Sequence, residues 1–171
     1  NRSLFNGATD VAHCHHEQLD GSGYPRGLKE VGISFYTRII AIVDLYDNFT
    51  TGYAGNPPKS SLDAMRHLYS LRGKHYDDKL VLQFIQCIGL YPPGSIVELR
   101  CGQVGIVIST NYKNRRLPKM LMLLDANKQK QKNRVINLGD EKQQGDNKEY
   151  LIKDVLINGS FDIDINEHIK K

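Results

Sequence analysis

Hydrophobic residues in the first half of the chain recur at helical spacing. The segment 33–50, ISFYTRIIAIVDLYDNFT, predicts a long core helix with Ser34 as its N-cap. The apolar positions of this helix are Phe35, Ile39, Ile42, Val43 and Tyr46. Two shorter helices are predicted after it, SLDAMRHLYSLRG ending near Gly73 and DDKLVLQFIQCIG ending near Gly89.

The pattern changes at Pro92 and Pro93. Beyond them, short β-branched runs alternate with turns rich in Asn, Gly and Lys, which indicates antiparallel strands. The runs lie at 96–97, 104–108, 120–124 and 135–136. The polar stretch 126–149 is expected to form a hairpin or loops without a buried face. The predicted fold is mostly α, a helical bundle followed by a small antiparallel β-subdomain.

Composition narrows the classes of function. The net charge of +4 is mild, and acidic residues interrupt the Lys and Arg residues of 126–149, so we expect a solvated hairpin and no nucleic-acid partner. No apolar run approaches the roughly 18 residues of a membrane span, and no signal peptide is evident. Cys14, Cys87 and Cys101 form no CxxC pair, and Cys87 is expected to be a core thiol. These features predict a soluble, cytoplasmic protein with no membrane segment in this chain.

Candidate metal chemistry is concentrated in HHEQLDGSGYPR, residues 15–26. Glycine and proline after Leu19 should end the preceding helix there. Consecutive helical residues diverge by roughly 100°, so His15 and His16 are expected to face two different ions. Iron, manganese or zinc suits neutral imidazole, and Glu17 or Asp20 could orient a ring. The alternative is that these histidines only cover a polar helix face.

Asp44 is the other candidate ligand. It lies within an apolar helical run, where an unpaired buried carboxylate would cost several kcal/mol. Its partner could be a metal cation or an arginine such as Arg38. The residues alone do not favour either.

The string HHEQLDGSGYP closely resembles the defining segment of HD-GYP domains, which are bacterial metal-dependent phosphodiesterases that hydrolyse cyclic di-GMP. RIIAIVDLYD and the segment 89–97 are similar to further parts of these domains, so the resemblance covers about residues 8–110. It implies that His15, His16 and Asp44 are metal ligands, with Asp47 a helix-face or second carboxylate near the site. It also implies a di- or trinuclear iron or manganese centre in the complete domain. The loop expected to meet substrate or a partner contains Asp20, Gly21, Gly23, Tyr24 and Pro25.

The family's His-Asp dyad lies upstream of this segment, and no His-Asp pair occurs in the 171 residues. The resemblance therefore implies a C-terminal portion whose catalytic dyad is elsewhere. This chain alone is expected to bind metal weakly or not at all, and to be inactive. The expected division is 1–92, the C-terminal helices of an HD-GYP domain, and 93–171, a β-rich subdomain with a polar hairpin or loop.

One stretch departs from the family. Where HD-GYP domains commonly place a phosphate-binding arginine about nine residues after the aspartate, this chain has Tyr53, and the nearest cation is Lys59. Lys59 is thus the candidate phosphate-binding residue. The leading function is hydrolysis of cyclic di-GMP. The alternatives are a non-catalytic cyclic-dinucleotide sensor or interaction module, whose GYP loop docks a diguanylate cyclase, and a helical fold with incidental histidines.

Overall fold

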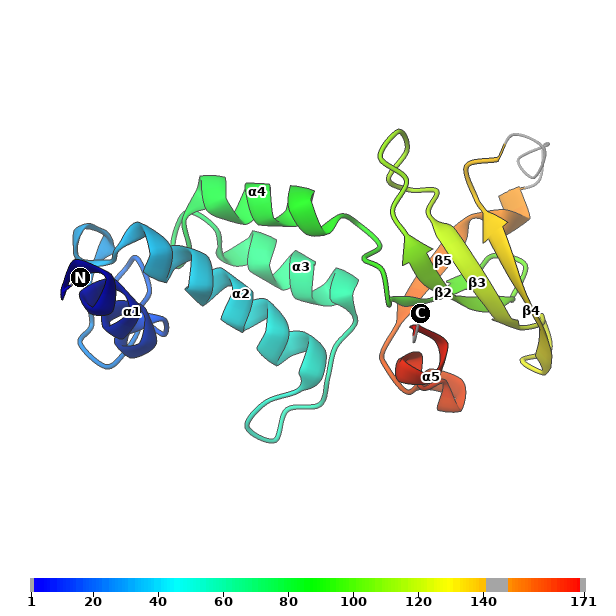
Figure 1. The fold of residues 1–171 in the computed structure, drawn as a ribbon, viewed down its shortest axis with the longest axis horizontal. Helices are drawn as coiled ribbons and strands as arrows, with labels where there is room; N and C mark the ends of the chain where they lie inside the picture. Colours follow the sequence, from blue (N-terminus) through cyan, green and yellow to red (C-terminus); the bar gives the residue numbers. More distant parts are fainter. Residues whose placement is uncertain (1, 141–147, 170–171) are drawn as a thin grey trace. The chain divides into compact units, whose positions relative to one another are not determined.

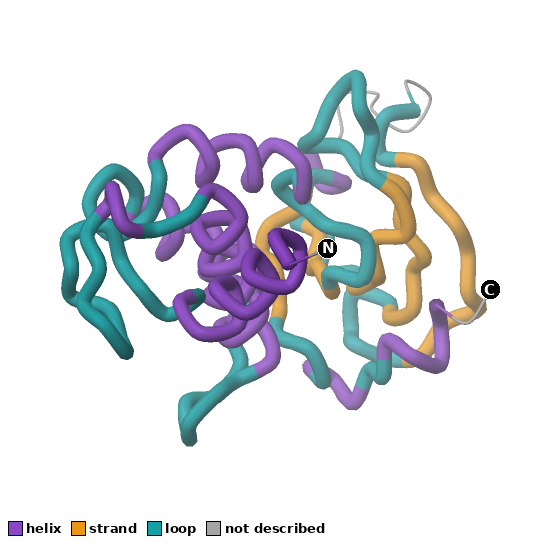
Figure 2. The backbone as a smooth tube through the Cα atoms, turned by 60° about the vertical axis from the view of Figure 1, so that its left-hand side comes forward, coloured by secondary structure: helices purple, strands orange, loops and turns teal. Residues whose placement is uncertain are grey.

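The computed structural model describes residues 2–140 and 148–169, which form two compact units. One unit is Asn1–Pro57 with Asp63–Cys87, and the other is Pro58–Leu62 with Ile88–Lys171. The first is helical and the second contains the sheet (Figures 1 and 2).

The helical unit is built from α1 (Arg2–Cys14), α2 (Phe35–Thr51), α3 (Ser61–Leu71) and α4 (Asp78–Ile88). Its core joins three of these helices through Ile42 of α2, Leu68 of α3 and Val81 of α4. The Ser34 side chain accepts a hydrogen bond from the Thr37 N–H, so the predicted N-cap of α2 is confirmed.

The core face of α2 differs from the predicted one. Ala41 and Ile42 are buried, whereas Phe35 is 60% and Val43 41% exposed. The set of core positions predicted for this helix was too wide, because α2 packs on its neighbours over a narrower face. Asp44 lies at the edge of that face, with its side chain 33% exposed, so the expectation of a deeply buried carboxylate is wrong.

The second unit contains an antiparallel sheet of β1 (Ile96–Leu99), β2 (Val104–Ser109), β3 (Lys119–Leu124), β4 (Lys130–Asn137) and β5 (Ile152–Leu156). The strand order is β4-β3-β2-β1-β5. Alternate residues belong to two separate clusters: Val97 and Val107 to one, Ile96 and Ile106 to the other. Both faces are therefore covered, and Ile163, just before the short helix α5 (Ile165–Ile169), packs in the second cluster.

The described secondary structure corrects several predictions for the second unit. The antiparallel sheet is confirmed, but the chain is not mostly α, because a five-stranded sheet accompanies the helices. Strand β5 was not predicted. The stretch 126–149 contains β4 and has buried residues, Ile136 and Leu138; its part 141–147 lies outside the described residues. Cys87 is exposed and is not a core thiol.

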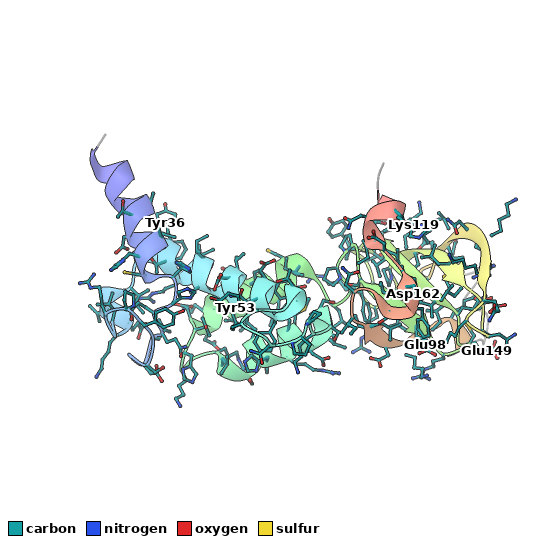
Figure 3. The ribbon with its side chains drawn as sticks, turned by 90° about the horizontal axis from the view of Figure 1, so that it is seen from below. Tyr36, Tyr53, Glu98, Lys119, Glu149 and Asp162 are labelled. Atoms are coloured by element: carbon teal, nitrogen blue, oxygen red, sulfur yellow. The ribbon has the colours of Figure 1, made fainter. Side chains whose placement is uncertain are left out.

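Electrostatic pairing on the sheet centres on Glu98 of β1, labelled in Figure 3. Its carboxylate lies 3.0 Å from Lys128 Nζ and 3.2 Å from Lys153 Nζ. The hydrogen bond from Lys128 lowers the pKa of Glu98, and the one from Lys153 acts in the same direction. These contacts tie β1 to the β3–β4 turn and to β5.

Strand β4 offers a test of the packing. Ile136→Ala should lower the free energy of unfolding by about 2–5 kcal/mol, because Ile136 is 3% exposed in the core. Val135→Ala, one residue away and 52% exposed, should change it by roughly 0.5 kcal/mol or less. Denaturant unfolding of both variants measures the difference. Equal effects would show that β4 does not pack as described.

Candidate metal centre

His15 and His16 lie in the turn that follows α1. This helix ends at Cys14, earlier than predicted, and the ring centroids of His15 and His16 lie 4.1 Å apart. His15 Nδ1 lies 3.1 Å from the Val11 carbonyl oxygen and 3.0 Å from that of Ala12. An Nδ1–H that donates to these carbonyls leaves Nε2 as the lone-pair nitrogen. His15 can therefore offer Nε2 to a cation.

Asp44 projects from α2 toward His16. Its Oδ2 accepts a hydrogen bond of 2.9 Å from Asn48 Nδ2 and lies 3.7 Å from His16 Nδ1. Arg38 is not its partner, since the guanidinium instead lies 3.3 Å from Asp77 and 3.5 Å from Glu30. The alternative prediction, that Asp44 forms an ion pair with Arg38, is therefore wrong.

The structure brings the three predicted ligands together. One ligand atom from each of His15, His16 and Asp44 lies within 4.8 Å of the other two. Two atoms that bind one ion at about 2.2 Å lie at most about 4.4 Å apart, so small side-chain movements would suffice for one ion. The expectation that the two histidines must face different ions does not follow from this geometry. Within the described residues, no fourth His, Cys, Asp or Glu joins the group.

The buried side chain of Glu17 binds the backbone of the glycine-rich loop. Glu17 is 2% exposed, and its two carboxylate oxygens accept hydrogen bonds from the Arg26 and Leu28 N–H groups, at 2.6 and 2.8 Å. Glu17 therefore binds the loop backbone and not, as one prediction had it, a histidine ring. A Cβ on Gly23 would lie 2.5 Å from the Glu17 Cα, which only glycine avoids.

Tyr24 connects this loop to the candidate ligands. Its ring stacks on His16, with centroids 4.6 Å apart and planes at 29°, and its N–H donates to the His16 carbonyl at 3.3 Å. The ring remains 58% exposed, and the Tyr24–Pro25 peptide bond is cis. One face of the Tyr24 ring thus packs on His16, and much of the side chain stays accessible.

Asp20 supports the start of the loop and does not contact the two candidate histidines. It accepts hydrogen bonds from the hydroxyl and the N–H of Ser22, and these lower its pKa. His75 Nδ1 lies 3.3 Å from Asp20 Oδ2, and the next residue, Gly21, has φ of +84°. Asp20 therefore shapes the turn that Gly21 allows.

Residues 53 and 59, in the stretch that departs from the HD-GYP pattern, are both exposed to solvent. Tyr53, labelled in Figure 3, lies just after α2 and is 60% exposed. Lys59 is exposed and belongs to the second unit. A phosphate contact by Lys59 stays a prediction.

Sequence reasoning missed three residues near Asp44 and the loop. Asn48 lies one turn after Asp44 on α2, a spacing that could have indicated the hydrogen bond. Burial raises the pKa of Tyr76, and the charge of Asp44 acts in the same direction. The His75 carbonyl accepts from the Leu19 N–H at 3.0 Å, a contact between distant segments that no sequence pattern indicates.

Comparison with known proteins gives one consistent result. The model of the HD domain family matches residues 3–80. Cyclic di-GMP phosphodiesterase PA4108 of Pseudomonas aeruginosa is 32% identical over 117 residues, covering 68% of this chain and 28% of that protein. A cyclic di-GMP phosphodiesterase of Thermotoga maritima is 37% identical over 86 residues, or 50% and 23% of the two chains. The 3′3′-cGAMP-specific phosphodiesterase 2 of Vibrio cholerae is 35% identical over 80 residues, or 47% and 15%.

The chain thus spans less than a third of the length of each of these relatives. In the described part of the chain, no helix has the length and hydrophobicity that a membrane crossing requires. The family match covers the turn that contains His15 and His16, the whole glycine-rich loop, and α2, which carries Asp44. The helical unit of this chain is therefore a member of the HD superfamily, of the HD-GYP type.

Proposed function

We propose that this chain supplies part of the metal centre of a phosphodiesterase that hydrolyses cyclic di-GMP. The observation that carries the proposal is the convergence of His15, His16 and Asp44 beside the glycine-rich loop. The relatives named as cyclic di-GMP phosphodiesterases support the reaction. A cytoplasmic location stays a prediction.

The donor set fits iron or manganese. Two imidazoles and one carboxylate are ligands that both metals accept, and the three side chains are half-buried, so an ion could reach them. A divalent ion bound here would act as a Lewis acid on a phosphoryl oxygen. Three protein ligands fill only half of the positions of an octahedral ion. We propose that a di- or trinuclear centre needs further ligands, which the complete domain would supply.

The chain's own residues would position the ligands and the substrate. The backbone carbonyls at the end of α1 orient His15, and Asn48 orients Asp44. The exposed side chain of Tyr24 offers a ring beside the candidate metal site on which a guanine base can stack. We propose that a base binds on the loop and that the phosphate chemistry takes place next to it.

The substrate class is a cyclic dinucleotide. Some relatives are named for cyclic di-GMP and others for 3′3′-cGAMP, and both compounds have two phosphodiester bonds. The manganese-loaded native protein is incubated with each dinucleotide in turn, and the products are analysed by chromatography. This assay shows which of the two compounds is hydrolysed. Hydrolysis of cyclic di-GMP that is lost in His16→Ala supports the proposal. Hydrolysis of neither compound would contradict it.

A non-catalytic sensor is the second candidate. It is favoured by the presence of only three grouped ligands in the described residues and by Tyr53 where the family commonly has arginine. A sensor would bind the dinucleotide without hydrolysing it, and its loop could dock a diguanylate cyclase. Binding measured by calorimetry, together with no product, would identify the sensor.

Position 53 tests whether this stretch meets the substrate. Tyr53→Arg should lower KM for cyclic di-GMP by about 10- to 100-fold, because a guanidinium forms charge-assisted hydrogen bonds with phosphate. Lys59→Ala should raise KM if Lys59 makes the phosphate contact at present. Steady-state assays on the native protein give both values. Unchanged KM in both variants would show that residues 53–59 do not contact the substrate.

A further inference from the structure

The carboxylate of Glu17 is buried, although it directly follows two half-buried candidate ligands. Its side chain is 2% exposed and contacts no cation among the interactions described for it. Its two carboxylate oxygens instead accept hydrogen bonds from the backbone N–H groups of Arg26 and Leu28, nine and eleven residues later in the chain. A buried carboxylate needs hydrogen-bond donors, and these two bonds give one to each of its oxygens.

These bonds fix the loop at its far end. Its near end is fixed by the hydrogen bond from the Tyr24 N–H to the His16 carbonyl and by the close backbone approach at Gly23. Between the two ends lies the Tyr24 ring, stacked on His16. The position of this ring therefore depends on how firmly Glu17 holds Arg26 and Leu28.

We infer that Glu17 is a positioning residue: it holds the loop so that Tyr24 packs on His16 and fixes the orientation of that candidate ligand. This inference rests on the proposed function only in so far as His16 binds a metal. The positioning itself is a property of the metal-free chain. It assigns to Glu17 a role distinct from metal binding or catalysis.

The chain contains no tryptophan, which permits a local probe. Tyr24→Trp introduces a single tryptophan, whose emission can be excited selectively, at an accessible position on the loop. In the metal-free chain, adding Glu17→Gln should shift the emission to longer wavelength and increase quenching by acrylamide, because an amide group offers one acceptor where the carboxylate offered two. Glu167→Gln, the same change at an exposed glutamate of α5, is the matched control and should leave the emission unchanged.

Amide hydrogen exchange provides the second readout. In Glu17→Gln, exchange at Arg26 or Leu28 should be about 10- to 100-fold faster, the ratio expected for loss of a charge-assisted hydrogen bond. Exchange in α2 and α4 should stay slow, which separates a local effect from unfolding. If Glu17→Gln does not fold, Glu17→Asp retains the charge but is one methylene too short to reach both amides, and should give the same local pattern.

The outcomes are distinct. Unchanged emission and unchanged exchange at Arg26 and Leu28 in a folded variant would overturn the inference. Faster exchange throughout the helical unit in both variants would also overturn it, because Glu17 would then support the fold as a whole. A changed loop in a protein that fails to hydrolyse any cyclic dinucleotide would refute the proposed function and leave the positioning role intact.

Discussion

Asp44→Ala is expected to weaken manganese binding by the native protein by about 100-fold or more. Even residues that only orient a ligand typically contribute 10- to 100-fold to metal affinity, and Asp44 is the one carboxylate in the group. Removing it also leaves Asn48 Nδ2 without its acceptor. Hydrolysis of cyclic di-GMP should fall with the metal content. Elemental analysis and a product assay measure the two effects together.

The control for this variant is Asp47→Ala. Asp47 is an exposed carboxylate on the same helix, three residues on, and does not belong to the group of candidate ligands. This variant should retain its metal. Equal metal content in the Asp44 and Asp47 variants would show that Asp44 is not a ligand.

Gly23→Ala is expected to destabilise the helical unit and to displace the glycine-rich loop. Its new Cβ would lie 2.5 Å from the Glu17 Cα and from the His16 carbonyl oxygen, where the obstacles are backbone atoms that cannot rotate away. We expect a loss of about 1–3 kcal/mol in the free energy of unfolding of the helical unit, with displacement of the loop from His16. Thermal and denaturant unfolding measure the loss.

Gly7→Ala in α1 is the matched glycine control. An added Cβ there meets no atom within 4 Å, and alanine favours a helix over glycine by up to about 1 kcal/mol. This variant should be as stable as the parent or more stable. A Gly23→Ala variant that behaved the same way would show that the loop does not pass as close to His16 as described.

Local signals predicted much of the helical unit. The N-cap at Ser34 and the end of α4 near Gly89 follow from residues adjacent in sequence, and the structure has both. The end of α1 was predicted too late, because the chain leaves the helix at Cys14 without a glycine or proline. The orientation of His15 and His16 depends on that turn, so it could not be predicted from helical geometry.

The candidate ligands were identified through the resemblance to HD-GYP domains, and the residues alone left Asp44 undecided between a metal and an arginine. The role of Glu17 was not predicted because its partners are backbone N–H groups nine and eleven residues away, which carry no side-chain signature. Strand β5 was missed because only Val155 of its five residues is buried. Such contacts arise from tertiary packing, which overrides local preference.

We propose above all that His15, His16 and Asp44 bind a divalent metal ion. Diffraction from crystals grown with manganese, measured near the manganese absorption edge, tests it most directly. We expect an anomalous peak about 2.0–2.3 Å from a nitrogen of each histidine and from a carboxylate oxygen of Asp44. Clear manganese peaks elsewhere on the protein, with none among these three side chains, would contradict it.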